Sequence, residues 1–205
     1  MTLNPVNASG SANLPFHQHA MLFYSNDNGD EDKAVAKYVN EGLRRGYLTV
    51  YLPVNTYNIS QQPKIVSEIV DYKENVNRGN LLTLDIMSFY NFALAGEMEP
   101  FEEFKIMLEE AIKERTASKR NDEIILVMGV VGGLAENQKF DECLNLERWW
   151  QKTHSEWLQK GLKVTIICPH PSPILDKDHF MHYKQTISSL HDITLGPFSR
   201  RTSST

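Results

Sequence analysis

Two pairs of residues in this sequence combine, at close spacing, side chains that bind transition metals. They are His17-x-His19 and Cys168-x-His170, and imidazole nitrogen and thiolate sulfur are ligands that zinc prefers. The apolar runs beside them predict one strand that begins at His19 and another that ends at Cys168. If the two strands are parallel, this arrangement separates the two residues by roughly 15 Å. We therefore expect no shared metal site, a thiol at a strand end and histidines at the surface.

Other polar residues that could take part in binding or catalysis lie in segments predicted to be helices. His179, His182 and His191 lie in the last of these, where exposed helical histidines account for them. Glu147 lies in an aromatic segment, and we expect it to be partly buried with a shifted pKa. The aromatic stripe around it is typical of a core: Trp149, Trp150 and Trp157. The sequence has no nucleophile elbow, His-Glu-x-x-His motif or paired carboxylates on a strand edge, so it indicates no catalytic centre.

These residues are positioned by short apolar runs that alternate with longer amphipathic segments. Strands are predicted at 19–24, 48–54, 81–86, 123–130, 163–168 and 192–195. Helices are predicted at 30–45, 62–76, 100–116, 140–160 and 178–191. The alternation predicts a three-layer α/β/α fold with a mostly parallel central sheet.

The composition favours one domain at 16–197 between polar ends at 1–15 and 198–205, which we expect to be disordered. The chain has 205 residues, of which 41% are hydrophobic, and its net charge of -5 offers no basic surface for nucleic acid or anionic membranes. No apolar run approaches the roughly 20 residues of a bilayer span, and the N-terminus lacks a signal-peptide pattern. We expect a cytoplasmic protein whose two cysteines, Cys143 and Cys168, are free thiols.

Several segments resemble one known family in the order in which they occur. The run His19-Ala-Met-Leu-Phe-Tyr24, an acidic turn, and the sequences AKYVNEGLRRG at 36–46 and TVYL at 49–52 are similar to the opening of the MEDS domain. This is the methanogen and methylotroph sensory domain. Downstream, NLER at 145–148 and KVTIICPH at 163–170 resemble the family's late helix, whose glutamate Glu147 matches, and its strand that ends in cysteine. The resemblance spans roughly residues 16–197.

The resemblance implies a fold related to RecA and to the clock protein KaiC. It also implies a bacterial or archaeal ligand sensor of the kind that accompanies signalling or transcription-regulator domains. Because the sequence carries no attached output domain, we expect its signal to pass to a protein partner.

The loop after the first predicted strand lies where a RecA-like ATPase holds its phosphates. It reads SNDNGDEDK at 25–33, with one glycine, four acids and no Gly-Lys-Ser/Thr. The acids repel a triphosphate and favour a helix N-terminus. The fourth predicted strand runs into GVVGG at 129–133, where a tight turn toward the next helix is favoured over close approach of a ligand. We therefore expect a degenerate phosphate loop and no conventional ATP hydrolysis.

Ligands of parallel sheets bind beyond the carboxyl ends of the strands. This rule, with the family match of Glu147, gives the predicted ligand-binding residues: Tyr24, Ser25, Asn26, Asp85, Gly129, Gly132, Glu147, Cys168 and His170. No catalytic residue, metal ligand or cofactor is assigned, and no phosphate loop supports a nucleotide. We expect a non-enzymatic sensory or regulatory domain that binds a small ligand and signals through a protein partner or a homo-oligomer. Two alternatives stay open, a divergent ATPase or nucleotide-binding enzyme and an oligomerisation scaffold.

Overall fold

The computed structural model describes residues 14–25, 30–53, 65–117 and 122–196. Its strands are β1 (His19–Tyr24), β2 (Leu48–Leu52), β3 (Leu81–Thr83), β4 (Glu123–Met128), β5 (Lys163–Pro171) and β6 (Ile193–Leu195). They form one sheet in the order β3-β2-β4-β5-β1-β6, and every pair of neighbours is parallel. The predicted polar ends, except Leu14 and Pro15, and Asn26 lie outside the described residues.

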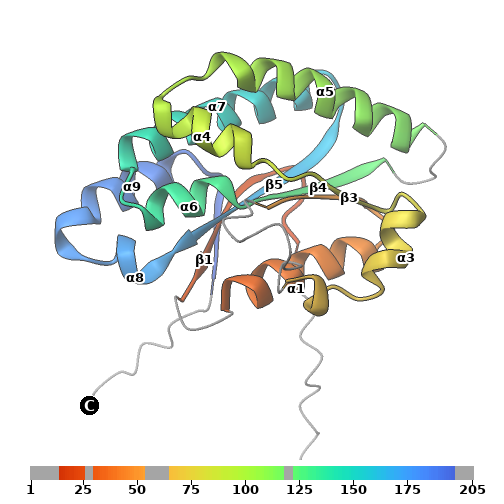
Figure 1. Ribbon diagram of the computed structural model, residues 1–205, viewed down its shortest axis with the longest axis horizontal. Helices are drawn as coiled ribbons and strands as arrows, with labels where there is room; N and C mark the ends of the chain where they lie inside the picture. Colours follow the sequence, from red (N-terminus) through yellow and green to blue (C-terminus); the bar gives the residue numbers. More distant parts are fainter. Residues whose placement is uncertain (1–13, 26–29, 54–64, 118–121, 197–205) are drawn as a thin grey trace, which may run out of the picture.

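Helices cover both faces of this sheet (Figure 1). They are α1 (Asp30–Arg44), α2 (Ile65–Glu68), α3 (Tyr72–Asn77), α4 (Met87–Ala95), α5 (Glu99–Thr116), α6 (Val130–Glu136), α7 (Phe140–Gln159), α8 (Ser172–Leu175), the 3-10 helix η1 (Asp178–Phe180) and α9 (Met181–Ser189). The first three pack on one face, and α4 to α9 pack on the other. The predicted three-layer α/β/α architecture is therefore confirmed.

Alternation along the strands assigns neighbouring side chains to opposite layers. Met21 and Cys168 belong to the larger core under α5 and α7, whereas Ala20 and Ile167 belong to the smaller core under α1. Strands buried on both faces are expected to be nearly continuous apolar runs, as these are. A polar residue in such a run, such as His19, is therefore buried wherever its neighbours are.

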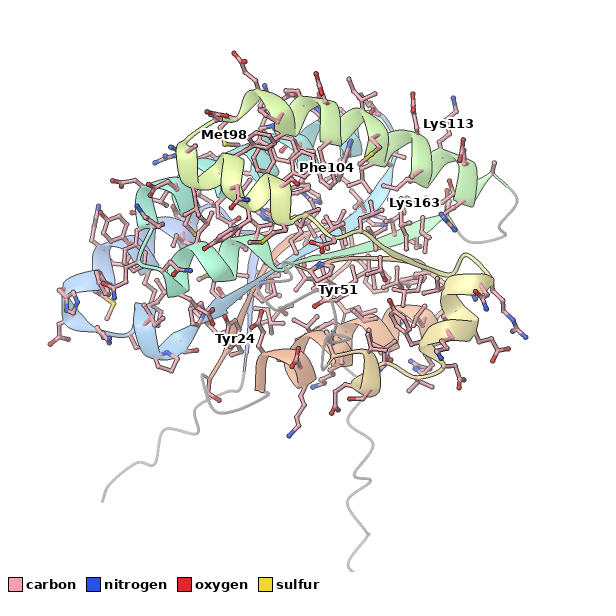
Figure 2. The ribbon with its side chains drawn as sticks, in the orientation of Figure 1. Tyr24, Tyr51, Met98, Phe104, Lys113 and Lys163 are labelled. Atoms are coloured by element: carbon pink, nitrogen blue, oxygen red, sulfur yellow. The ribbon has the colours of Figure 1, made fainter. Side chains whose placement is uncertain are left out.

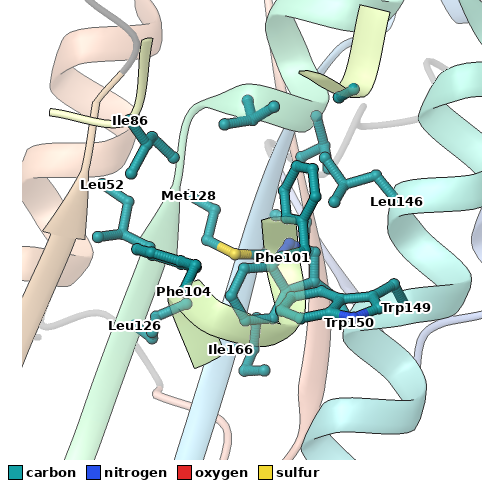
Figure 3. Close-up of a cluster of buried hydrophobic side chains, with 14 of the residues drawn as sticks. Leu52, Ile86, Phe101, Phe104, Leu126, Met128, Leu146, Trp149, Trp150 and Ile166 are labelled. Carbon is teal, nitrogen blue, oxygen red and sulfur yellow. The ribbon is translucent and has the colours of Figure 1, made fainter. Parts of the chain in front are cut away.

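The larger core centres on the aromatic side chains of α5 and α7 (Figure 3). Phe101 lies edge-on to Trp149 with ring centroids 5.4 Å apart, and the centroids of Phe104 and Trp150 are 6.5 Å apart. Trp149 Nε1 donates to Glu102 Oε1 at 2.7 Å, which satisfies its one polar atom. The core interpretation of the tryptophans is confirmed. Among the described residues, no helix is both long and apolar enough to cross a bilayer.

Several predicted elements differ from those of the structure: the third and fourth strands are shorter, at Leu81–Thr83 and Glu123–Met128, and the helix expected at 178–191 ends at Ser189. The single helix expected at 62–76 is two short helices, because Asp71 between them has a left-handed backbone with φ 49. The first residues of that predicted helix, 62–64, lie outside the described residues. Val54, which was predicted to end the second strand, also lies outside them. The tight turn expected at 129–133 is wrong, because helix α6 begins at Val130, directly after β4. Its buried residues, which include Val131 and Leu134, pack on the core and override the low helix propensity of glycine.

The relative register of β1 and β5 decides where the polar side chains meet. His19, the first residue of β1, pairs with Ile166, three residues after the start of β5. Strand β5 also continues past Cys168 to Pro171, which the sequence prediction missed. Beyond Ile167 it no longer pairs with β4, and a strand with one free side tolerates proline. Cys168 therefore lies inside the strand, beside Met21 of β1.

Candidate functional site

A cluster of polar side chains is buried between the sheet and the helices of the larger layer. It consists of His19, Glu147, Cys168, His170 and His191, and we name it the buried polar cluster. The first four are at most 1% exposed, and the side chain of His191 is 0% exposed. Burying polar groups costs free energy unless each finds a partner, so such a cluster needs a physical explanation.

The members come from four elements that are distant in the sequence. His19 begins β1, while Cys168 and His170 lie two residues apart on β5 and therefore face the same layer. Glu147 lies in the middle of α7, one turn after Cys143 on the buried face of that helix. His191 lies in the turn between α9 and β6. Only the folded chain brings these residues together.

Short distances join the polar atoms of the cluster. His19 Nε2 lies 3.2 Å from Cys168 Sγ and 3.4 Å from Glu147 Oε2. His191 Nε2 lies 3.3 Å from the same carboxylate oxygen, and His170 Nε2 contacts Glu147 Oε1 at 2.7 Å. The predicted separation of roughly 15 Å between His19 and Cys168 is therefore wrong, because it ignored the register offset and the extension of β5.

The histidines were expected at the surface, and this interpretation is wrong for three of them. His19 and His170 are buried as members of strands that are covered on both faces. His191 was assigned to an exposed helix face, but α9 ends at Ser189 and the turn that follows directs its ring inward. No local sequence pattern marks that turn. The useful signal in the sequence was the alternation of His19, Cys168 and His170 with core residues.

Backbone carbonyls orient two of the imidazole rings. His19 Nδ1 donates to Leu190 O at 3.0 Å, and His191 Nδ1 donates to Ile187 O at 2.8 Å. A carbonyl oxygen only accepts hydrogen bonds, so Nδ1 carries the proton in both rings. Both Nε2 atoms therefore face Glu147 Oε2.

Three buried atoms of the cluster have no hydrogen-bond partner among the described residues. They are Glu147 Oε2, His191 Nε2 and His170 Nδ1. His191 Nε2 and Glu147 Oε2 lie within ion-pair distance but lack hydrogen-bond geometry. An orphaned buried polar atom costs about 1–3 kcal/mol, so the centre of the cluster is costly as it stands.

The pKa values describe how charge is distributed in the cluster. Burial alone would raise the pKa of Glu147, but the charge of His191 and contacts with His170, His19 and His191 hold it well below its usual value. Burial opposes protonation of His191, but Glu147 raises its pKa above the usual value. Burial and then the charge of Glu147 raise the pKa of the Cys168 thiol. These directions favour the charged form of Glu147, the protonated form of His191 and the neutral thiol of Cys168.

A second polar group lies at the carboxyl ends of β1 and β5. The chain leaves β1 toward α1 on one face and leaves β5 toward α8 on the other, which is the topological position where such sheets bind ligands. Tyr24 donates from its hydroxyl to Glu136 Oε1 at 2.9 Å. Burial, then Glu136 and Asp32, raise the pKa of Glu31 to about 7. Figure 2 shows Tyr24 at this end of the sheet and Lys163 at the other.

The structure divides the predicted ligand-binding residues between these two places. One group lies at or just after the carboxyl ends of β1, β3 and β4: Tyr24, Ser25, Asp85, Gly129 and Gly132. The other group belongs to the buried polar cluster: Glu147, Cys168 and His170. Asp85 Oδ1 accepts from the Met87 N–H at 2.9 Å at the start of α4. A Cβ on Gly132 would lie 2.9 Å from Pro169 O, so this glycine permits close packing of α6 on β5.

The architecture is similar to that of a KaiC-like protein from the hyperthermophilic archaeon Pyrococcus horikoshii. The TM-score is 0.51 over 89% of this chain and 72% of that chain, with 12% sequence identity. The protein has a KaiC-like fold. At this identity the likeness concerns the fold alone. No family model and no curated protein sequence matches the chain.

Proposed function

We propose that the protein is a non-enzymatic sensory or regulatory domain of the cytoplasm that binds a small ligand at the buried polar cluster. The observation that carries this proposal is the fully buried contact between Glu147 Oε2 and His191 Nε2, which lie 3.3 Å apart and have no hydrogen-bond partner. A ligand that bonds to both atoms would remove the cost of leaving them unpaired. The resemblance to the MEDS family supports a sensory role for a protein that binds such a ligand.

The hydrogen bonds around His191 couple this site to the turn that connects α9 and β6. The His19 N–H donates to Asp192 Oδ2 at 2.8 Å, and the Asp192 N–H donates to His19 O at 2.8 Å. These bonds hold the turn that connects α9 to β6. A ligand bound to His19 and His191 would restrain the same turn and shift the population of its conformations.

The elements on either side of that turn are accessible to a partner. Strand β6 is the last in the sheet order, and it pairs with β1. Met181 at the start of α9 and Ile193 at the start of β6 are each 37% exposed. An edge strand offers backbone groups to another chain, so a protein partner or a second copy of the chain could bind β6 in a way that depends on its conformation.

The acidic residues at the carboxyl ends of β1 and β5 disfavour a nucleoside triphosphate as the ligand. The pKa of Glu31 is raised by burial and by its acidic neighbours Glu136 and Asp32. A polyphosphate at this edge would add negative charge to a group of acids that already repel one another. This charge pattern favours the regulatory proposal over a divergent ATPase.

A thermal-shift screen with nucleotides, small organic compounds and metal ions tests the proposal. Binding to the folded state stabilises it by about 2.7 kcal/mol at a ligand concentration 100 times Kd. We expect at least one class to raise the melting temperature of the wild type and of Glu136→Gln, but not of Glu147→Gln. We also expect no magnesium-dependent ATP hydrolysis. ATP turnover that Glu136→Gln changes, or a screen without any shift, would reject the proposal.

A further inference from the structure

We propose that the ligand of the buried polar cluster is a zinc-type transition-metal ion, held by His19 Nε2, Glu147 Oε2, Cys168 Sγ and His191 Nε2. This inference rests on the proposed function only in placing the ligand at the same cluster. The four residues come from β1, α7, β5 and the turn before β6. Their four ligand atoms all lie within 4.8 Å of one another.

The spacing of these atoms suits tetrahedral coordination. Zinc binds nitrogen or oxygen at about 2.0–2.2 Å and sulfur at about 2.3 Å, so neighbouring ligand atoms of a tetrahedron lie about 3.3–3.8 Å apart. The observed distances from His19 Nε2 to Cys168 Sγ and to Glu147 Oε2 are 3.2 and 3.4 Å. The distance from His191 Nε2 to Glu147 Oε2 is 3.3 Å. The three remaining pairs of ligand atoms lie within 4.8 Å, so movements of about 1 Å bring all four atoms to the spacing of a tetrahedron.

The surrounding hydrogen bonds are those expected of metal ligands. Histidines that bind zinc donate their second ring N–H to a carbonyl or carboxylate, which fixes the tautomer and the direction of the lone pair. His19 and His191 donate from Nδ1 to Leu190 O and Ile187 O. The other carboxylate oxygen, Glu147 Oε1, contacts His170 Nε2 at 2.7 Å, which favours binding through Oε2 alone.

The chemistry of the donor set selects the class of ion. Two imidazoles and a thiolate favour zinc and similar ions over calcium or magnesium, which prefer oxygen ligands. One thiolate and one carboxylate supply two negative charges, which neutralise a divalent ion in this buried position. Four protein ligands leave no open position for a reacting water, so the site suits sensing or folding rather than hydrolysis.

Binding replaces protons by the metal ion. The Cys168 thiol releases its proton to solvent, as does the His191 ring when it is protonated, and the ion forms one bond to each of the four ligand atoms. No oxidation or reduction occurs. In the competing arrangement, the Glu147 carboxylate and the His191 imidazolium form a buried ion pair that binds no metal.

Cobalt titration of the full chain distinguishes these arrangements. After dialysis against a chelator, wild-type protein is titrated with Co²⁺, which reports thiolate ligation through a sulfur-to-cobalt charge-transfer band. We expect one Co²⁺ per chain and displacement by Zn²⁺. Cys168→Ser should lose the band, and His191→Gln should keep it but bind at least about tenfold more weakly.

The other cysteine provides a matched control. Cys143 is also fully buried and lies on the same helix as Glu147, but its Sγ contacts Val131 O at 3.6 Å, outside the cluster. Cys143→Ser should retain the band. Folding of every variant is checked by circular dichroism. If Cys168→Ser is unfolded, the weaker Co²⁺ binding of His191→Gln is the test, and unchanged affinity in that variant would overturn the site. A folded wild type without cobalt absorption, or a band lost in Cys143→Ser but kept in Cys168→Ser, would overturn the metal site.

The outcomes separate this inference from the proposed function. If no metal binds but an organic compound stabilises the wild type and not Glu147→Gln, the regulatory proposal stands and the metal site is wrong. If Co²⁺ binds as expected but hydrogen exchange at α9 and β6 is unchanged, the metal site stands and the regulatory role is wrong.

Discussion

Glu147 and Glu31 illustrate how position in the fold changes the chemistry of a carboxyl group. Burial alone would raise the pKa of each, but histidines surround Glu147 whereas acidic residues lie near Glu31. As a result, the pKa of Glu147 falls well below its usual value and that of Glu31 rises to about 7. Sequence alone predicted burial and a shifted pKa for Glu147 but not which partners would supply the shift.

Glu147→Gln should destabilise the folded chain. The substitution leaves His191 without its counter-charge in a site where its side chain is 0% exposed. Removing one partner of a buried ion pair costs about 3–5 kcal/mol. Urea unfolding of the chelator-treated protein measures this loss. Glu142→Gln on the same helix, where the carboxylate lies 3.8 Å from the exposed Lys139, should change stability by less than about 1 kcal/mol. Equal losses would contradict the ion pair.

Glu31→Gln should change the pH dependence of stability. The raised pKa means that folded Glu31 holds its proton between pH 4.5 and about 7, whereas unfolded Glu31 has lost it. The stability that Glu31 contributes is therefore complete below pH 4.5 and is lost as pH rises to about 7. Relative to wild type, the variant should gain about 2–3 kcal/mol of stability between about pH 5 and about pH 8. Urea unfolding at both pH values measures this gain, with the exposed Glu103→Gln as control. If the stability difference between the variant and wild type is the same at both pH values, the raised pKa of Glu31 is contradicted.

At the scale of elements, α6 approaches the sheet more closely than its sequence indicates. Gly132 packs against Pro169 of β5 and the Tyr24 hydroxyl of β1, while Gly133 faces the ring of Tyr90 on α4. The glycine-rich sequence suggested a turn because glycine lowers helix propensity, but close packing of this short helix requires the small residue. The regular helices at 30–44, 99–116 and 140–159 were predicted to within one residue at each end, since their amphipathic period is long and uninterrupted.

Gly132→Ala should therefore destabilise the protein more than Gly133→Ala. The new methyl group at position 132 would lie 2.9 Å from the carbonyl oxygen of Pro169, which is backbone and moves only with β5. At position 133 the nearest atom is Tyr90 Cε2 at 3.2 Å, in a side chain that can adjust. Overpacking costs about 1–3 kcal/mol, which exceeds the helix-propensity gain of about 1 kcal/mol. Thermal unfolding compares the two variants, and the reverse order would contradict the packing.

At the scale of the whole molecule, the sheet layers were predictable and the buried polar cluster was not. Alternating apolar and amphipathic segments determine the α/β/α class. The cluster depends instead on a three-residue offset between β1 and β5, on the continuation of β5 through two prolines, and on the turn at His191. Each depends on tertiary pairing and has no local sequence signal. This is why His19 and Cys168 were predicted far apart but are in contact.

Hydrogen–deuterium exchange tests most directly whether the buried polar cluster communicates with the sheet edge. Exchange is measured in wild type and Glu147→Gln with and without saturating Zn²⁺, or with the organic compound if the screen identifies one. We predict slower exchange of residues 181–195 in ligand-bound wild type, unchanged exchange in α1, and no response in Glu147→Gln. Ligand binding that protects α1 but leaves residues 181–195 unaffected would contradict the account.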